Sequence, residues 1–467
     1  MSVSDIGLIA SIAVSSTAGF ILGFVTGLVP GLHVNNVAAA VIAYAGTMLG
    51  CFAVMGELLG CDAPGLLISC FLVSALVSHN FSEAAPNTFV GVPASDAVSV
   101  LPAHRLAKAG LGWLAVRSSI DGSMAGVLLA TVMIVPVCLC MGPWIGIYAA
   151  LKTVMGVLII LFSVILVLSD RGSNDPISDS VGDRARIAMI ASGLFTTSGL
   201  LGMVVLESDY FCSDLSPLPF GSEPISSSSL LLPLFAGLFG LPTLLLSLSQ
   251  EEGAYVEMAR GIKLSPGTYR SESLLAVFGG LLVGWIPGMT SGSSATLCAI
   301  IARKPLGEGC GVDASRRFIW LYSAISSAGA VLSIGALFVI LRARSGVMDA
   351  VTIFLGDIDP FDGEMGDLVA PCALLLSMML SAIASHSLMQ SMRGILKRGA
   401  KHLLSKRLTI TCIIFICVLA AALTGFRGIL LMSAACSLGL LPPRLGARRI
   451  HLMGCLLVPI SISFLTG

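Results

Sequence analysis

Two stretches of this sequence place small polar side chains directly after a Pro-Gly pair. Residues 27–36 read GLVPGLHVNN and residues 284–296 read GWIPGMTSGSSAT, and each stretch lies between apolar runs. If the chain breaks at each pair, a new helix starts there with free N–H groups and a positive dipole end. Such an end binds a carboxylate or a phosphate, and unwound carbonyls beside it can hold Na⁺. The two stretches therefore predict an anion site built from two half-helices.

Both stretches supply residues that we expect to hold an anion and its coupling ion. Serine, threonine and asparagine at these positions would also cap the restarted helices, and the two roles are compatible. His33 has two open interpretations, a residue that couples protons or a histidine with a structural role. The predicted site comprises Gly27, Pro30, Gly31, His33, Asn35, Asn36, Gly284, Pro287, Gly288, Thr290, Ser291, Gly292, Ser293 and Ser294.

A third polar stretch runs from Ala85 to Asp96, and its two prolines and one glycine argue against a plain helix. It is either a re-entrant loop whose Asp96 takes part in cation coupling or an ordinary cytoplasmic loop. His104 and Arg105 follow it, and we expect them to anchor the chain at the membrane interface. His451 lies among basic residues near the end of the chain and is expected only to add to the charge of one membrane side.

The sequence carries none of the motifs of metalloproteases, serine hydrolases or P-loop nucleotide binding. It also has no soluble stretch long enough to form a nucleotide-binding domain. These observations predict a protein that is not an enzyme, with no catalytic residue, no bound metal and no cofactor other than a coupling Na⁺ or H⁺.

The composition decides which class of protein must position these residues. Of the 467 residues, 56% are hydrophobic and 11% are charged, and the mean hydropathy is +0.96. A soluble surface needs far more polar residues, so a soluble enzyme, a nucleic-acid-binding protein and a disordered chain are excluded. Long apolar runs, in place of short alternating segments, indicate a helix bundle that spans a membrane.

We expect an all-α polytopic protein with about 12–14 transmembrane or half-spanning helices. Several apolar segments are shorter than the roughly 20 residues that a full span needs. The 14 predicted segments are 6–29, 32–55, 63–80, 118–141, 144–169, 185–206, 228–248, 273–287, 289–302, 317–341, 367–390, 408–425, 427–442 and 450–466.

The basic residues indicate how the chain is oriented. With the N-terminus outside and 14 crossings, 22 of the 26 lysines and arginines fall in connections on the inner side. The positive-inside rule therefore favours both termini outside, in a multi-pass protein of the cell membrane. Four basic residues fall on the opposite side, namely Lys152, Arg342, Arg344 and Arg427.

The recurrence of the Pro-Gly stretch also predicts an internal repeat. Residues 1–250 would form the first membrane repeat, 251–272 a cytoplasmic linker and 273–467 the second repeat. Seven segments per repeat is an odd number, so the second repeat would enter the membrane upside down. Inverted repeats with broken helices are typical of secondary transporters.

The chain resembles the large permease (TctA) of the tripartite tricarboxylate transporter family. The resemblance rests on the two Pro-Gly stretches, on residues 89–112 (FVGVPASDAVSVLPAHRLAKAGLG), on residues 235–247 (FAGLFGLPTLLLS) and on residues 441–459 (LPPRLGARRIHLMGCLLVP). His33, Asn35 and Asn36 replace the more glycine-rich stretch of the bacterial pattern. The residues around His104 are more similar to the archaeal branch of the family.

This resemblance implies secondary transport of tri- or dicarboxylates such as citrate, driven by an ion gradient. The bacterial pattern implies two partners, a small membrane subunit and an extracytoplasmic binding protein, whereas the archaeal permease commonly occurs without them. Membrane lipid is the other expected partner, and nucleic acid is not expected. The alternatives are a carrier of polyprenyl-phosphate-type lipid anions, an intramembrane enzyme, and a membrane scaffold that transports nothing.

Overall fold

The computed structural model describes residues 3–30, 32–91, 100–170, 181–207, 227–248, 270–302, 311–356, 358 and 368–466, and it forms helices and no strands within them. Gly31 and Asp96 lie outside the described residues. The first half contains α1 Val3–Gly27, α2 Val34–Ala43, α3 Ala45–Leu59, α4 Pro64–Ser82, α5 Ala84–Phe89, α6 Val100–Leu106, π-helical η1 Ala107–Leu111, α7 Gly112–Met141, α8 Ile147–Leu168, α9 Val181–Glu207, α11 Ser227–Phe235, π-helical η2 Ala236–Gly240 and α12 Leu241–Leu248. The second half contains α13 Arg270–Trp285, α14 Ser291–Ile301, α15 Val312–Ile340, α16 Gly346–Leu355, α17 Val369–Ser391, α18 Arg393–Leu403, α19 Lys406–Gly439, α20 Leu441–Leu445, the 3₁₀ turn η4 Arg449–Met453 and α21 Gly454–Thr466.

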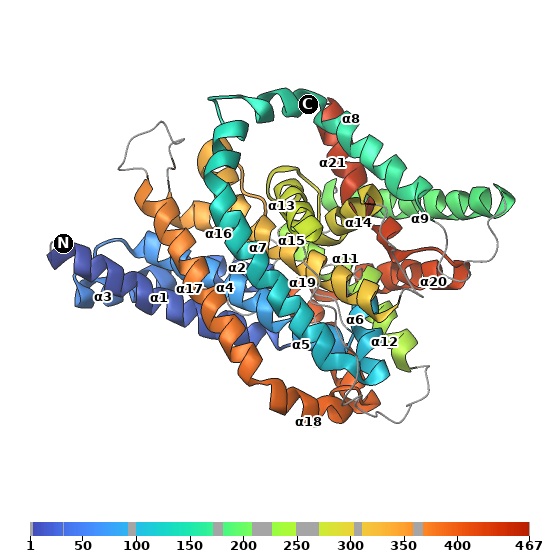
Figure 1. The fold of residues 1–467 in the computed structure, drawn as a ribbon, viewed down its shortest axis with the longest axis horizontal. Coiled ribbons are helices and arrows are strands. Elements are labelled where there is room, and N and C mark those ends of the chain that lie inside the picture. The colour runs from blue at the N-terminus through green and yellow to red at the C-terminus, as the bar shows by residue number, and fades with distance from the viewer. Residues whose placement is uncertain are drawn as a thin grey trace.

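Within these residues, ten helices are long and apolar enough to cross a membrane (Figure 1). Helices α2 and α3 form a further broken pair bent by 87°, and α13, α14 and α16 are shorter apolar helices. The all-α polytopic prediction is confirmed. The sequence did not predict α16, and it divided α19 in two near Gly425, where the structure has a non-helical kink (φ 64°, ψ −160°) inside one element.

The polar stretch from Ala85 begins as a helix and leaves it before Gly91, which has φ +78°, while residues 92–99 lie outside the described residues. Residues Ala84–Phe89 form α5, and Pro86 occupies its third position. A proline costs little in the first turn of a helix, since the N–H that it lacks has no partner inside the helix there.

Small residues let two pairs of helices pack closely (Figure 1). In α1, glycines 19, 23 and 27 contact α4 near Phe71, Ala75 and His79. The contacts advance in the same direction along both helices, so the two helices run parallel. In α13, Gly280 and Gly284 contact α15 in the same way. Close backbone approach at glycine is a usual means of helix association in lipid, where the hydrophobic effect does not drive it.

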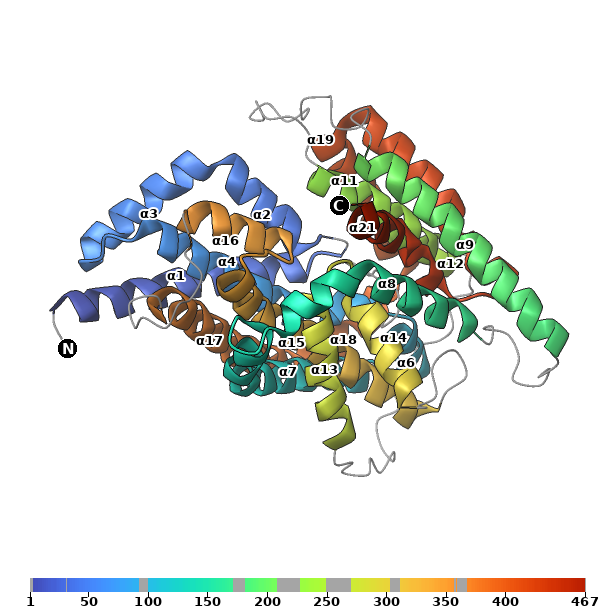
Figure 2. The same ribbon diagram turned by 90° about the horizontal axis from the view of Figure 1, so that it is seen from above.

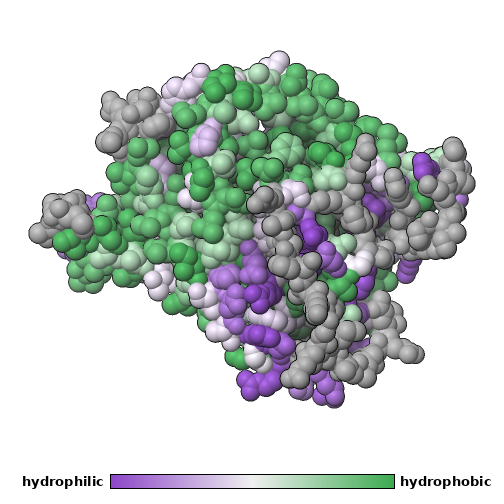
Figure 3. All heavy atoms as spheres, in the orientation of Figure 1, coloured by the Kyte–Doolittle hydropathy of each residue, from purple (hydrophilic) through white to green (hydrophobic). Residues whose placement is uncertain are grey.

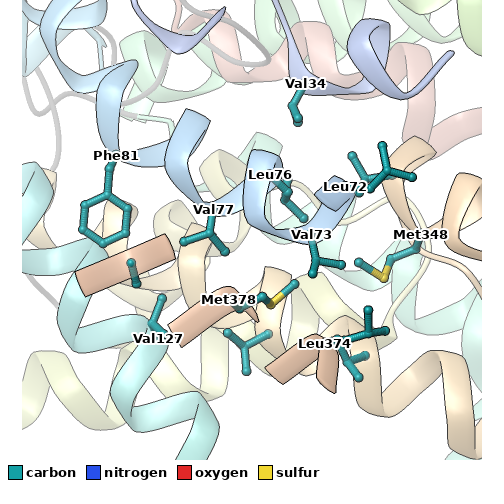
Figure 4. Packing of buried hydrophobic residues seen from close by; sticks show 14 of the residues in the cluster. Val34, Leu72, Val73, Leu76, Val77, Phe81, Val127, Met348, Leu374 and Met378 are labelled. Carbon is teal, nitrogen blue, oxygen red and sulfur yellow. The ribbon is translucent and has the colours of Figure 1, made fainter. Parts of the chain in front are cut away.

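Buried apolar residues form two large clusters, which Figure 2 shows as two groups of helices. The larger cluster joins α1–α5 and α7 to α15–α18, and its centre around Leu76, Val77 and Met378 is shown in Figure 4. The smaller cluster joins α8, α9, α11 and η2 to α19, η4 and α21. Each cluster contains residues from both halves of the chain, so the two halves interleave in space.

The surface in Figure 3 is apolar over most of the visible face. Hydrophilic residues gather over α18 and the neighbouring ends of α17 and α7 (Figure 3). Helix α18 carries five basic residues, and the Arg393 guanidinium lies 6.0 Å from the ring centroid of Trp113 in α7. A basic helix beside an apolar belt is suited to the boundary between lipid and water.

Candidate functional site

The first Pro-Gly stretch forms the tip of a helical hairpin. Helix α1 ends at Gly27, the described residues 28–30, 32 and 33 break the helix, and the chain returns through α2 and α3. The return is complete, because the carbonyls of Leu59 and Gly60 lie against Gly7 near the start of α1. The predicted break is therefore present at residues 28–33, which we call tip 1.

The second Pro-Gly stretch forms the tip of another hairpin. Helix α13 ends at Trp285, and α14 returns along it, because the Ser294 hydroxyl donates a hydrogen bond to the Gly279 carbonyl at 2.9 Å. Gly288 in the turn has φ +76°, which favours glycine, and a side chain there would meet Ile460 of α21. We call residues 286–290 tip 2.

Each tip ends in a capped helix N-terminus. His33 is the N-cap of α2, and its Nδ1 accepts a hydrogen bond from the Asn35 backbone N–H at 3.1 Å. Thr290 is the N-cap of α14, and its Oγ1 accepts from the Ser293 N–H at 3.2 Å while the Ser293 hydroxyl accepts from the Thr290 N–H at 2.9 Å. The structure thus gives His33 a structural bond, and the expected caps are present at both tips.

The other predicted residues divide between the tips and the helix contacts. Pro30, Pro287 and Ser291 are half-buried at the tips, as are Asn35 and Asn36. In contrast, the glycines at 27, 284 and 292 and the serines at 293 and 294 are buried. A side chain at position 27 would lie 2.1 Å from the Ser82 hydroxyl, and one at position 284 would lie 3.1 Å from the Gly329 carbonyl. Gly27 and Gly284 therefore serve helix packing.

Near Asn35 of α2 and Trp285 of α13 the structure places Arg344, which was not predicted from the sequence. The Nη2 atom of Arg344 donates a hydrogen bond to the Tyr148 hydroxyl at 2.9 Å. The ring of Tyr148 lies 6.1 Å from the ring of Trp285, the residue just before tip 2. Two residues after Arg344, a side-chain carbon at Gly346 would lie 3.3 Å from Asn35 Cβ. Arg344 therefore lies between Asn35, just after tip 1, and Trp285.

Several polar atoms around Arg344 are buried and lack a hydrogen-bond partner among the described residues. They are Nε of Arg344, Nε1 of Trp285 and Oδ1 of Asn35. Leaving such an atom unpaired costs about 1–3 kcal/mol. A helix terminus contributes about 0.3–1 kcal/mol to anion binding, and a hydrogen bond to a charged group about 1.5–3 kcal/mol. Arg344 would therefore be the strongest single group for an anion in this region.

The sequence did contain a signal for Arg344. It is one of four basic residues on the side of the membrane opposite to the other 22 in the predicted orientation. An arginine that departs from the charge bias is costly in or near lipid and commonly has a function. What the sequence could not indicate is that Arg344 contacts Tyr148 and that Gly346, two residues later, lies beside Asn35.

A second polar region lies beside tip 1, around His79 of α4. The Nδ1 atom of His79 is 3.3 Å from Thr26 Oγ1, and its ring is 6.2 Å from the His33 ring. On its other side, His79 Nε2 lies 3.8 Å from Glu83 Oε2. The His79 side chain is 1% exposed and that of Glu83 is 16% exposed. Glu83 also lines a small polar cavity between α4, α5, α7 and α15.

The expectation for His451 is wrong, because this residue is buried and does not add to the surface charge. Its Nε2 lies 2.7 Å from Asp170 Oδ2, and Arg448 approaches Asp170 Oδ1 at 3.4 Å. Burial alone would raise the pKa of Asp170, but the hydrogen bonds and positive charges of these partners lower it overall. His104 is half-buried, and its Nδ1 lies 3.1 Å from the Thr88 carbonyl.

No group of three or more histidine, cysteine, aspartate or glutamate residues converges on a metal-sized point within the described part of the chain. The described residues instead form two polar regions that are not metal clusters. One is the region between the tips with its single arginine, and the other is the cavity beside Glu83.

The chain matches a known protein family over most of its length. Residues 14–454, which include both tips, match the Tripartite tricarboxylate transporter TctA family. An uncharacterized protein of the archaeon Methanocaldococcus jannaschii is 24% identical over 452 residues, which cover 96% of this chain and 98% of that protein. The chain matches no solved structure.

Proposed function

Because this multi-pass membrane protein belongs to the tripartite tricarboxylate transporter TctA family, we propose that it carries organic anions with two or three carboxylates, such as citrate. The anion would bind between tips 1 and 2, and alternating access around this site would move it across the membrane. A Na⁺ or H⁺ gradient would drive the transport, and the N- and C-termini would lie outside the cell membrane.

The observation that carries this proposal is the position of Arg344 between two capped helix starts. Its guanidinium supplies a fixed positive charge with a fork of donors that matches a carboxylate. The N-termini of α2 and α14 add dipoles of the same sign. The substrate would thus bring the negative charge that this region favours, and a second carboxylate would have a second helix end to bind.

Asn35 and Ser291 are the tip residues best placed to contact the substrate. Asn35 touches the start of α16 close to Arg344, and Ser291 opens α14 with a half-buried side chain. Both are polar and uncharged, so they can hydrogen-bond to a carboxylate without holding it too tightly for release. Pro30 and Pro287 would keep the tips from continuing as helices.

Uptake by purified protein in liposomes tests the proposal. The measurement compares citrate with other di- and tricarboxylates under imposed Na⁺ or H⁺ gradients. We expect gradient-driven accumulation of at least one carboxylate. Absence of uptake for every anion, together with binding of a polyprenyl phosphate, would overturn the proposal in favour of a lipid-anion carrier.

Three substitutions test the site itself. We expect Pro30→Ala, Asn35→Ala and Ser291→Ala each to lower carboxylate uptake by about tenfold. Each variant should lose about 1–1.5 kcal/mol of the free energy of carboxylate binding, through a lost contact or a changed shape of the tip, and 1.4 kcal/mol is a factor of ten. Size-exclusion profiles should stay unchanged. If all three variants transport at the wild-type rate, the site does not lie at the tips.

A further inference from the structure

The small cavity beside tip 1 has the chemistry of a cation site. It has a volume of about 20 Å³, enough for one water molecule or one dehydrated monovalent cation. Its lining is mostly oxygen-bearing, with Asn80, Glu83, Asn87, Ser119 and Ser323 among the residues around it. Carboxylate, amide and hydroxyl oxygens are the ligands that hard cations prefer.

The cavity lies between membrane-spanning helices. Its residues come from α4 and α5, from α7 and from α15, and α4 and α15 belong to the most buried spans. The hydroxyls of Ser119 in α7 and Ser323 in α15 lie 2.8 Å apart and close one wall. Among the described lining residues Glu83 is the one carboxylate. An ionised carboxylate between membrane-spanning helices is costly unless a positive charge accompanies it.

Several charged groups on the surrounding helices pair with each other. Asp121 of α7 pairs with His386 of α17 at 3.1 Å and with Arg117 at 3.4 Å. Arg316 of α15 pairs with Asp313 at 3.0 Å. His104 of α6 contacts the Thr88 carbonyl. His79 Nε2 lies 3.8 Å from Glu83 Oε2.

A continuous set of contacts leads from this cavity to tip 1. Glu83 approaches His79 one helical turn earlier in α4, and His79 contacts Thr26 and lies beside His33, the N-cap of α2. A cation at Glu83 would therefore change the charge next to His79, and with it the position of the tip. Coupling between two sites needs such a physical connection.

We propose that Glu83 and the oxygen atoms around this cavity bind the coupling cation, a single Na⁺ or proton, and that His79 links its binding to tip 1. This proposal rests on the proposed anion transport. It places coupling at Glu83, whereas the sequence suggested Asp96.

Two liposome assays separate coupling from transport. The first measures carboxylate accumulation under an inward Na⁺ gradient or an inward H⁺ gradient. The second measures exchange of labelled for unlabelled carboxylate with equal ion concentrations on both sides. We expect Glu83→Gln to lose at least tenfold in the first assay and to keep exchange within about twofold of the wild type. The gradient that drives carboxylate accumulation by the wild-type protein, Na⁺ or H⁺, identifies the coupling cation.

Further variants control this result. Glu57→Gln makes the same chemical change at an exposed position of α3 and should behave like the wild type in both assays. Glu83→Asp keeps the carboxylate but shortens it, so it should weaken the apparent cation affinity by several fold. If Glu83→Gln does not fold, Asn87→Ala and Ser323→Ala should produce the same weakening. Gradient-driven accumulation by folded Glu83→Gln at the wild-type level would overturn the proposal.

A binding assay tests the cation site even if the wild type carries no carboxylate. Purified protein in detergent is titrated with ²²Na⁺, and proton uptake is followed with a pH indicator. Loss of cation binding in Glu83→Gln but not in Glu57→Gln would support the site when transport fails. Unchanged cation binding in Glu83→Gln would overturn it, whichever anion the protein carries.

Discussion

Tips 1 and 2 use the same backbone device in different surroundings. Both end a helix at a Pro-Gly pair, and both restart it with a side chain that caps the new N-terminus. Tip 1 lies beside His79 and, through it, Glu83. Tip 2 packs against Ile460 and Leu457 of α21 and is capped by hydroxyl groups. The backbone explains what the tips share, and among their described contacts tip 1 alone lies beside a histidine of α4 and, through it, a carboxylate.

This difference suggests a division of labour. Two helix ends of the same sign can together hold an anion with more than one carboxylate, and Arg344 lies between them. Ion coupling requires a group whose charge changes or that binds a cation, and tip 2 has no such group among its described contacts. Coupling would therefore be carried by the first half of the chain, whereas anion binding would be shared.

Substituting Arg344 should have the largest effect, since both tips depend on it. Removing one member of a buried charge pair costs about 2–5 kcal/mol, so Arg344→Gln should lower carboxylate uptake by about 100-fold or more. Arg344→Lys keeps the charge but not the fork of donors and should lose about tenfold. Initial uptake rates in liposomes give both numbers.

The matched control is Arg342→Gln, which removes an exposed arginine from the same loop. It should retain wild-type uptake. Equal losses in both variants would mean that the charge of the loop matters and that the position of Arg344 does not.

The packing glycines give a smaller, structural effect that differs between the hairpins. A methyl group at Gly27 would overlap the Ser82 hydroxyl at 2.1 Å and the His79 carbonyl at 2.6 Å, whereas one at Gly284 has its nearest contact at 3.1 Å. Overpacking costs about 1–3 kcal/mol. Gly27→Ala should therefore lower the melting temperature in detergent by several degrees, and Gly284→Ala by clearly less. A larger loss of melting temperature for Gly284→Ala than for Gly27→Ala would show that the helices around Gly27 can move apart to make room for the methyl group.

The caps should have the smallest effects on binding. Loss of an N-cap costs about 1 kcal/mol, so His33→Ala and Thr290→Val should each raise the KM for the carboxylate by a few fold. The two variants should differ in another measurement. His33→Ala should also alter how uptake depends on the coupling cation, because His33 lies beside His79, and Thr290→Val should not. An altered cation dependence in Thr290→Val would remove the distinction between the tips.

Much of the site could be predicted from the sequence because it depends on local chemistry. Proline, glycine and small polar residues at Pro30, Pro287 and Thr290 determine where helices break and restart, and both breaks lie where they were expected. Arg344 and Glu83 were missed because their importance comes from neighbours distant in the chain. Tyr148 is 196 residues from Arg344, and Ser323 faces the cavity from the other half.

The same limit explains a wrong local expectation. His451 has basic neighbours in the sequence, but it is buried against Asp170, which lies 281 residues away. The helix at Ala84–Phe89 contains Pro86, which a helix tolerates in its first turn. Whether Pro86 falls in the first turn depends on where the helix starts.

By itself, the sequence determined the membrane location, the all-helical architecture and the two breaks, because hydropathy and backbone chemistry act over a few neighbouring residues. Only the tertiary structure decided which glycines pack helices, that Arg344 lies between the tips, and that Glu83 faces a cavity beside His79. These features depend on contacts between helices from both halves of the chain, and the spacing of residues along one helix carries no information about its partner.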